Sequence, residues 1–191
     1  MRIAVPEKVL KIIASIDAQG NVPLMRLTVL KKWFEGPGRL AAFGLWIAQR
    51  AAQAKGGARG AADALLEEAR ALLGSAASME SLDQQMDRAA AKSLRDRARD
   101  FQNDLQHQQW GPVRMIHCWP LLLVEEGLAL HLGPSRTPSA GYKLAADWAQ
   151  NYDSRYGNGL NGPSRAKLDE LVRFMLDLEA REENRAGKDF G

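Results

Sequence analysis

The stretch of sequence that decides the fold is Met79–Leu105, MESLDQQMDRAAAKSLRDRARDFQNDL. Its charged residues carry both signs, as is typical of a solvent-exposed helical face. Ser81, followed by Gln84 three residues later, can form a capping box at the start of a helix. Apolar residues recur every three or four positions, which is the spacing of one helical face: Met79, Leu82, Met86, Ala90, Leu94, Ala98, Phe101 and Leu105. The stretch therefore predicts one long amphipathic helix.

Apolar spacing of the same kind predicts helices on both sides of this stretch. Three helices precede it within residues 1–60, and a short one ends at Gly74, which is placed as a C-terminal cap. Two follow it, over Tyr142–Tyr152 and from about Pro163 onward. Alanine, the strongest helix former, clusters between Ala41 and Ala91. The sequence therefore predicts a mainly α protein, a bundle of about six or seven helices.

Residues 113–132 allow two interpretations. Two apolar runs, Val113–Val124 and Leu128–Leu132, flank Glu125-Glu126-Gly127, and this arrangement is typical of a β-hairpin. A buried helix over Leu121–Leu132 fits the same residues almost as well, because periodicity does not separate the two. The preferred prediction is one small hairpin within the helical bundle.

Charge divides the chain unevenly. Residues 1–60 hold ten Lys/Arg and three Asp/Glu, or +7, whereas residues 61–191 hold 16 and 20, or −4. We expect residues 1–56 to form a basic three-helix segment and residues 57–184 a helical remainder, packed with it as one domain or a second lobe. Residues 185–191 are expected to be a disordered tail. The charge split indicates either an anionic partner for the basic part or attraction within one molecule.

Several observations bear on the location of the protein. No stretch approaches the roughly 18 apolar residues that a membrane span needs. The N-terminus lacks the apolar run of a signal peptide. The single cysteine, Cys118, excludes an internal disulfide, which fits a reducing compartment. We therefore predict a cytoplasmic location of bacterial type, without membrane contact.

Patterns for catalysis, cofactors and metals are weak. Gly157–Gly162 satisfies G-x-G-x-x-G, but a dinucleotide site needs a strand before this motif, and the preceding residues read as a helix. Cys118 lies in an apolar run that favours a buried, inert thiol. The three histidines lack metal-ligand spacing: His107, His117 and His131. We therefore predict no catalytic residue, cofactor or metal ligand.

The strongest candidate surface lies on the third predicted helix, Arg39–Lys55. Four side chains share one face at spacings of seven, four and three residues: Arg39, Trp46, Arg50 and Gln53. Phe43 and Ile47 are assigned to the opposite, buried face. Arginines beside a tryptophan can contact phosphates and stack on a base or on a partner protein. The alternative is structural, with the tryptophan packed inside and the arginines paired with the acidic remainder.

Three classes of function remain. A non-catalytic protein-interaction or assembly module ranks first, because Ala-rich amphipathic helices with Leu and Met stripes suit helix-in-groove contacts. Its partner would be another protein or a second copy of the chain. A nucleic-acid-binding or regulatory protein that uses the basic N-terminal helices ranks second. An enzyme without a recognisable local motif ranks third.

Overall fold

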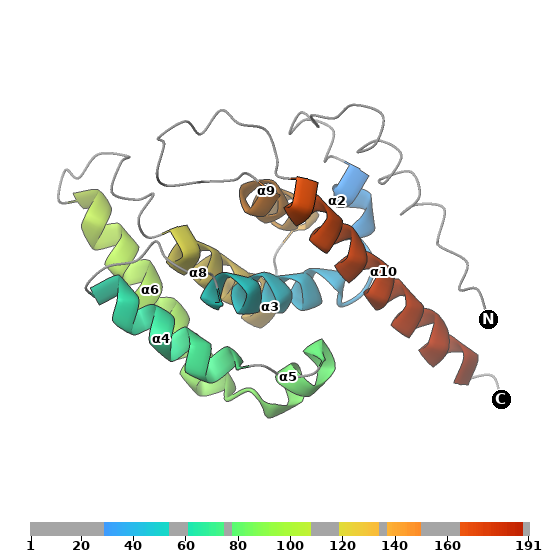
Figure 1. The fold of residues 1–191 in the computed structure, drawn as a ribbon, viewed down its shortest axis with the longest axis horizontal. Coiled ribbons are helices and arrows are strands. Elements are labelled where there is room, and N and C mark those ends of the chain that lie inside the picture. The colour runs from blue at the N-terminus through green and yellow to red at the C-terminus, as the bar shows by residue number, and fades with distance from the viewer. Residues whose placement is uncertain are drawn as a thin grey trace.

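The computed structural model describes residues 29–53, 61–74, 78–107, 119–133, 137–149 and 165–188. These residues form eight helices and no strand. The helices are α2 (Val29–Trp33), α3 (Arg39–Ala52), α4 (Ala61–Leu73), α5 (Met79–Gln85), α6 (Arg88–His107), α8 (Trp119–Leu132), α9 (Pro138–Ala149) and α10 (Arg165–Lys188). The predicted mainly α, multi-helix bundle is confirmed (Figure 1). The first predicted helix, near the N-terminus, lies outside the described residues.

The hairpin prediction is wrong over residues 119–132, which form helix α8. Residues 113–118 lie outside the described part of the chain. Helix α8 runs through the middle of the bundle and contacts α3, α4, α6 and α9 (Figure 1). Its residues Leu121, Val124 and Leu128 are fully buried. A helix that is buried on every side has no polar face, so its sequence lacks the helical period and resembles apolar strands.

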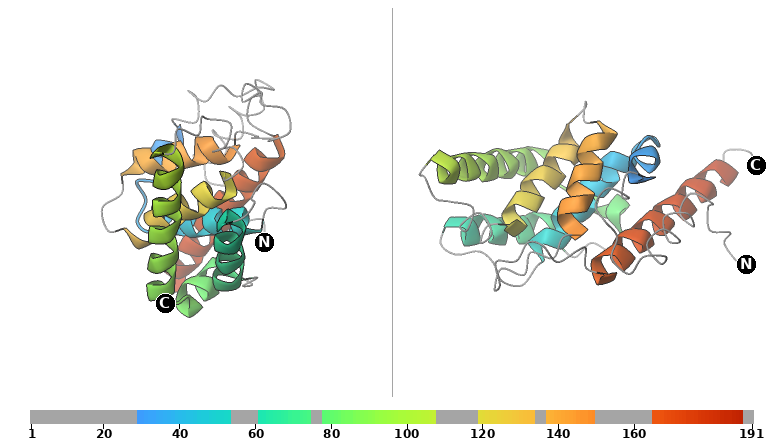
Figure 2. Two further views of the ribbon diagram at one scale, coloured as in Figure 1. Left: turned by 90° about the vertical axis from the view of Figure 1, so that its left-hand side faces the viewer. Right: turned by 90° about the horizontal axis from the view of Figure 1, so that it is seen from above.

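Two glycines allow α3 and α8 to cross at close range. A Cβ atom on Gly127 would lie 2.5 Å from the carbonyl oxygen of Gly44, and one on Gly44 would collide with the carbonyl oxygen of Gly127. Around this crossing, α4 and α6 pack at one end and α9 and α2 at the other (Figure 2). The α3–α8 crossing is therefore the centre of the bundle.

The helix predicted over Met79–Leu105 is divided into α5 and α6. Met86 adopts extended backbone, with φ −68° and ψ 127°. The Asp87 carboxylate then accepts hydrogen bonds from the backbone N–H groups of Ala89 and Ala90, at 2.9 and 3.1 Å. An aspartate that caps a new helix competes with continuation of the old one. Because of this break, the buried alanine is Ala91 and not the predicted Ala90.

Helix ends follow the sequence signals in part. Gly74 ends α4 with φ 45°, as predicted, and its N–H donates to the Arg70 carbonyl at 2.9 Å. The capping box of α5 forms between Ser78 and Ser81, one turn earlier than predicted. Residues 185–188 belong to α10 and are helical, in contrast to the predicted disordered tail. Residues 189–191 lie outside the described residues. Within the described part, no helix is long and apolar enough to cross a membrane.

A cluster of aromatic side chains joins α10 to the bundle. Trp46 of α3 stacks on Phe174 of α10, with ring centroids 4.8 Å apart and an interplanar angle of 26°. Trp148 of α9 meets Trp46 edge-on at 5.6 Å. Every ring of the cluster is buried: Trp33, Phe34, Phe43, Trp46, Trp148 and Phe174. Beyond this contact, the C-terminal part of α10 extends past the other helices (Figures 1 and 2).

Candidate interaction site

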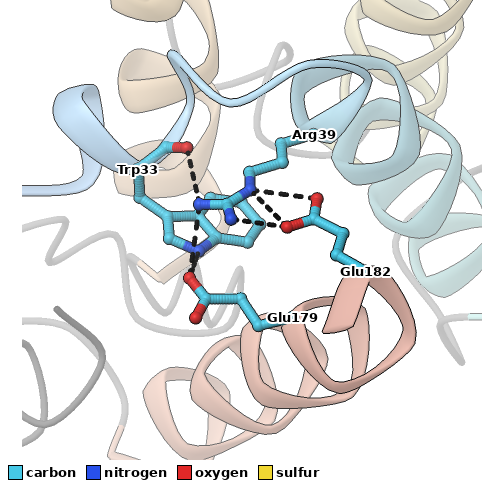
Figure 3. Close-up of polar contacts among 4 residues, drawn as sticks. All are labelled: Trp33, Arg39, Glu179 and Glu182. Atoms are coloured by element: carbon cyan, nitrogen blue, oxygen red, sulfur yellow. Dashed lines mark hydrogen bonds and ion pairs between the residues drawn. The ribbon is translucent and has the colours of Figure 1, made fainter. Parts of the chain in front are cut away.

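Arg39, the first predicted binding residue, is bound by α10. Its Nη2 lies 2.5 Å from Oε2 of Glu182, and its Nη1 lies 3.2 Å from Oε1 of Glu179 (Figure 3). The guanidinium carbon lies 5.0 Å from the centre of the Trp33 ring. The hydrogen bond to Glu182 raises the pKa of Arg39 above its usual value, although burial opposes the rise. Arg39 therefore fastens α10 to the start of α3.

Glu179 completes this connection and was not predicted. Its side chain is 7% exposed, and its Oε1 accepts a 2.8 Å hydrogen bond from the indole Nε1 of Trp33 (Figure 3). In the sequence it lies four residues after Met175 and eight after Leu171, so it continues the apolar stripe of the last helix. A carboxylate in such a stripe is a signal for a buried ion pair.

Trp46, the second predicted residue, is a core residue with 5% exposure. It stacks not only on Phe174 but also on Phe43, with ring centroids 6.1 Å apart and an interplanar angle of 27°. The assignment of Phe43 to the opposite face is therefore wrong. Three residues along a helix correspond to a rotation of 300°, which leaves the two side chains about 60° apart.

Arg50 and Gln53 differ in what they contact. The Nε2 of Gln53 donates to the Gly74 carbonyl at 3.2 Å, beside a matching bond from Gln49, so both amides cap the end of α4. Arg50 is 47% exposed; its guanidinium carbon lies 6.0 Å from the Trp46 ring centre, and its Nε lies 4.0 Å from Glu170. Of the four predicted residues, Arg50 thus combines a charge with substantial exposure and a loose ion pair.

Two hollows lie side by side between α3, α5 and α10. The larger has a volume of about 310 Å³ and the smaller about 200 Å³. Both are bordered by Met79, Leu178 and Arg181, so they adjoin at these residues and together make one surface. We name it the α3–α5–α10 groove, defined by Ala41, Ala42, Leu45, Trp46, Gln49, Arg50, Met79, Glu80, Asp83, Phe174, Asp177, Leu178, Arg181, Glu182 and Arg185.

His131, from the last turn of α8, lines the larger hollow. Its side chain is 4% exposed, and its Nδ1 lies 3.1 Å from the carbonyl oxygen of Ala41. Its Nε2 lies 3.0 Å from Oδ1 of Asp83 but lacks the alignment of a hydrogen bond. The nearest hydroxyl at the groove, that of Ser78, is engaged in the capping box of α5. The described groove thus presents a histidine beside a carboxylate without a free nucleophile.

Other chemistry has no support in the described residues. They contain no group of His, Cys, Asp or Glu side chains that could hold a metal ion. Cys118 and the Gly157–Gly162 motif lie outside them. Comparisons of the chain with protein-family models, with curated proteins and with solved structures find no match.

Proposed function

We propose that the protein is an interaction module without catalysis of its own, and that it binds a helix of a partner protein in the α3–α5–α10 groove. The groove is the observation that supports this most directly. Its walls are apolar at Ala42, Leu45, Met79 and Leu178, and its rim is charged. A helix that binds such a groove inserts apolar side chains at i, i+3 or i+4, and i+7 and leaves its polar face in water.

The nucleic-acid alternative has less support. Binding to phosphates requires cations that are free to release their counterions. Arg39 is paired with two carboxylates of α10, and the Nζ of Lys31 lies 5.0 Å from the centre of the Tyr142 ring. Trp46 is buried and cannot stack on a base. Arg39, Lys31 and Trp46 are therefore engaged in internal contacts, which weakens the support they gave to this alternative.

Peptide selection on the immobilised full-length protein tests the proposal. A library of helical peptides is selected against the wild type, and binding is then measured by fluorescence anisotropy. Ala42→Arg places a long charged side chain in the larger hollow, whereas Ala64→Arg adds the same charge to an exposed position of α4. Thermal melts establish that both variants fold.

The expected result is a set of peptides with an apolar stripe that bind Ala42→Arg at least about tenfold more weakly than wild type, a difference of about 1.4 kcal/mol. Their affinity for Ala64→Arg should equal that for the wild type. Equal affinity for all three proteins, or a selection that enriches no peptide, would overturn the proposal.

A further inference from the structure

We infer that the partner helix carries an acidic side chain about one turn from its apolar anchor, and that Arg50 and Arg181 bind this carboxylate over the smaller hollow. The inference rests on the proposed function and adds the chemistry of the partner. It follows from two arginines at the groove, one loosely paired and one without a partner among the described residues, and from the order of the two hollows along α3.

Most acidic groups at the groove are already neutralised. Oε1 of Glu80 accepts from Arg185 at 2.8 Å, and Oδ1 of Asp83 accepts from Arg88 at 2.9 Å. Glu182 is bound to Arg39. The rim of the larger hollow therefore has little negative charge to offer a basic partner.

The arginines at the smaller hollow are less completely paired with carboxylates. The ion pair between Arg50 and Glu170 spans 4.0 Å, with both side chains more than 40% exposed, and such surface pairs contribute little. Arg181 is exposed, and no hydrogen bond or ion pair joins it to another residue of the described part. Asp177 is the single carboxylate that lines this hollow. The charged residues that line this hollow, two arginines and one aspartate, sum to +1. An incoming carboxylate would compete with Glu170 for Arg50.

The setting favours a carboxylate geometrically as well. The guanidinium of Arg50 lies against Trp46, whose ring lines the smaller hollow together with Phe174. A planar guanidinium held on an aromatic ring can offer two parallel N–H donors to a carboxylate. Arg50 is 47% exposed and Arg181 is exposed, so this attraction would be made in water and would depend on salt.

The order of the two hollows along α3 sets the spacing in the partner. Ala42 lines the larger hollow and Trp46, four residues later, lines the smaller. Four residues of helix correspond to a rise of about 6 Å, or roughly one turn. A partner helix that lies along the groove would therefore place its acidic residue three or four positions from its apolar anchor.

Three synthetic peptides test the inference. Each is a fluorescein-labelled amphipathic helix with the same leucine stripe, and the position four residues from the first leucine is Glu, Gln or Lys. Their affinities are measured by anisotropy against wild type, Arg50→Gln/Arg181→Gln, Ala42→Arg and Arg173→Gln. Arg173 is exposed on α10 and does not line the groove, so Arg173→Gln serves as a charge control outside the groove, although it removes one charge where the double variant removes two.

The expected result is that wild type binds the Glu peptide at least about tenfold more tightly than the Lys peptide, with the Gln peptide between them. Arg50→Gln/Arg181→Gln should abolish this preference, Arg173→Gln should preserve it, and added salt should reduce it. Ala42→Arg should weaken the binding of all three peptides.

Other outcomes separate the inference from the proposed function. Equal binding of all three peptides, lost in Ala42→Arg, would overturn the inference and leave the proposed function intact. Absence of binding by every peptide would count against both. A dimer detected by sedimentation that Ala42→Arg disrupts would make a second copy of the chain the occupant. Tighter binding of a single-stranded oligonucleotide than of the Glu peptide, lost in Arg50→Gln/Arg181→Gln, would make phosphate the ligand. Either result would overturn the inference.

Discussion

Gly127→Ala tests the close crossing of α3 and α8 most directly. The new Cβ atom would lie 2.5 Å from the carbonyl oxygen of Gly44, whereas ordinary van der Waals contact begins at 3.4 Å. It would also lie 3.0 Å from the backbone nitrogen of Ala48 and 3.1 Å from its Cβ. These neighbours belong to helical backbone or are attached directly to it, so they cannot rotate away. The two helices must therefore move apart.

The expected loss of unfolding free energy follows from two opposing terms. Overpacking a well-packed core costs about 1–3 kcal/mol, and displaced backbone places this site at the upper end or beyond. Alanine in place of glycine stabilises a helix by about 1 kcal/mol. We expect a net loss of about 2 kcal/mol, which corresponds to roughly 4–8 °C in Tm for a chain of this size. The sign is opposite to that of the same substitution at an uncrowded helical position.

Urea unfolding followed by far-UV circular dichroism measures the loss. Gly141→Ala is the matched control, because a Cβ there would meet the end of the Leu40 side chain and the ring of Phe34, which can adjust. We expect it to cost less than Gly127→Ala. The double variant Gly44→Ala/Gly127→Ala should lose less than the sum of the single variants, since the first already separates the helices. A Gly127→Ala protein as stable as wild type would refute the close crossing.

Three further substitutions, all on α10, test its contacts with the rest of the bundle. Glu179→Ala should lower the unfolding free energy by about 3 kcal/mol in urea titrations, because it removes an acceptor from the buried Trp33 indole and from Arg39. Glu182→Ala should lower it by less than about 1 kcal/mol. The Glu182 side chain lies closer to Arg39 than that of Glu179 does, but it is 36% exposed. A larger loss for Glu182→Ala would contradict this. Burial lowers the pKa of Lys167 below 10.5, and Glu170 opposes the shift. The unfolded chain therefore binds more protons at alkaline pH below 10.5, so stability should rise with pH there. In thermal melts, the Lys167→Met protein should not show this rise of stability with pH and should have a higher Tm at neutral pH than wild type. An unchanged dependence of Tm on pH would show that Lys167 does not cause the rise.

The helical class could be predicted because a half-buried helix has a local period. The stripe of α6 is read correctly at Leu94 and Ala98, both of which are fully buried. The period fails where burial or capping overrides it. Helix α8 is surrounded by other helices and has no polar face. Its sequence therefore fitted a buried helix and a β-hairpin almost equally well. Asp87 restarts the helix after Met86, so the first buried residue of α6 is Ala91 and not the predicted Ala90, and the predicted stripe is met again at Leu94.

The candidate site could be predicted only in part, because a helical wheel identifies residues that share a face and not what covers that face. Arg39, Trp46, Arg50 and Gln53 do lie near one another on the wheel, but different elements cover them. The start of the face is bound by Glu182, its middle is buried under Phe174, and its end caps α4. These neighbours lie far away in the sequence, which no local pattern reveals.

Three basic side chains in the described residues 29–53 contact other helices of the molecule. Of the Lys/Arg side chains described in residues 29–53, Arg39 and Arg50 pair with α10 and Lys31 lies over the Tyr142 ring of α9. Arg39 and Lys31 are thus engaged within the molecule, whereas Lys32 is exposed and Arg50 keeps a loose ion pair. The contacts with α10 also explain why the proposed site combines two distant parts of the chain. α10, held in place by Arg39 and the aromatic cluster, brings Arg181 to the hollow that Arg50 borders. A protein partner would then be recognised by Arg181 and by Arg50, whose internal ion pair with Glu170 spans 4.0 Å.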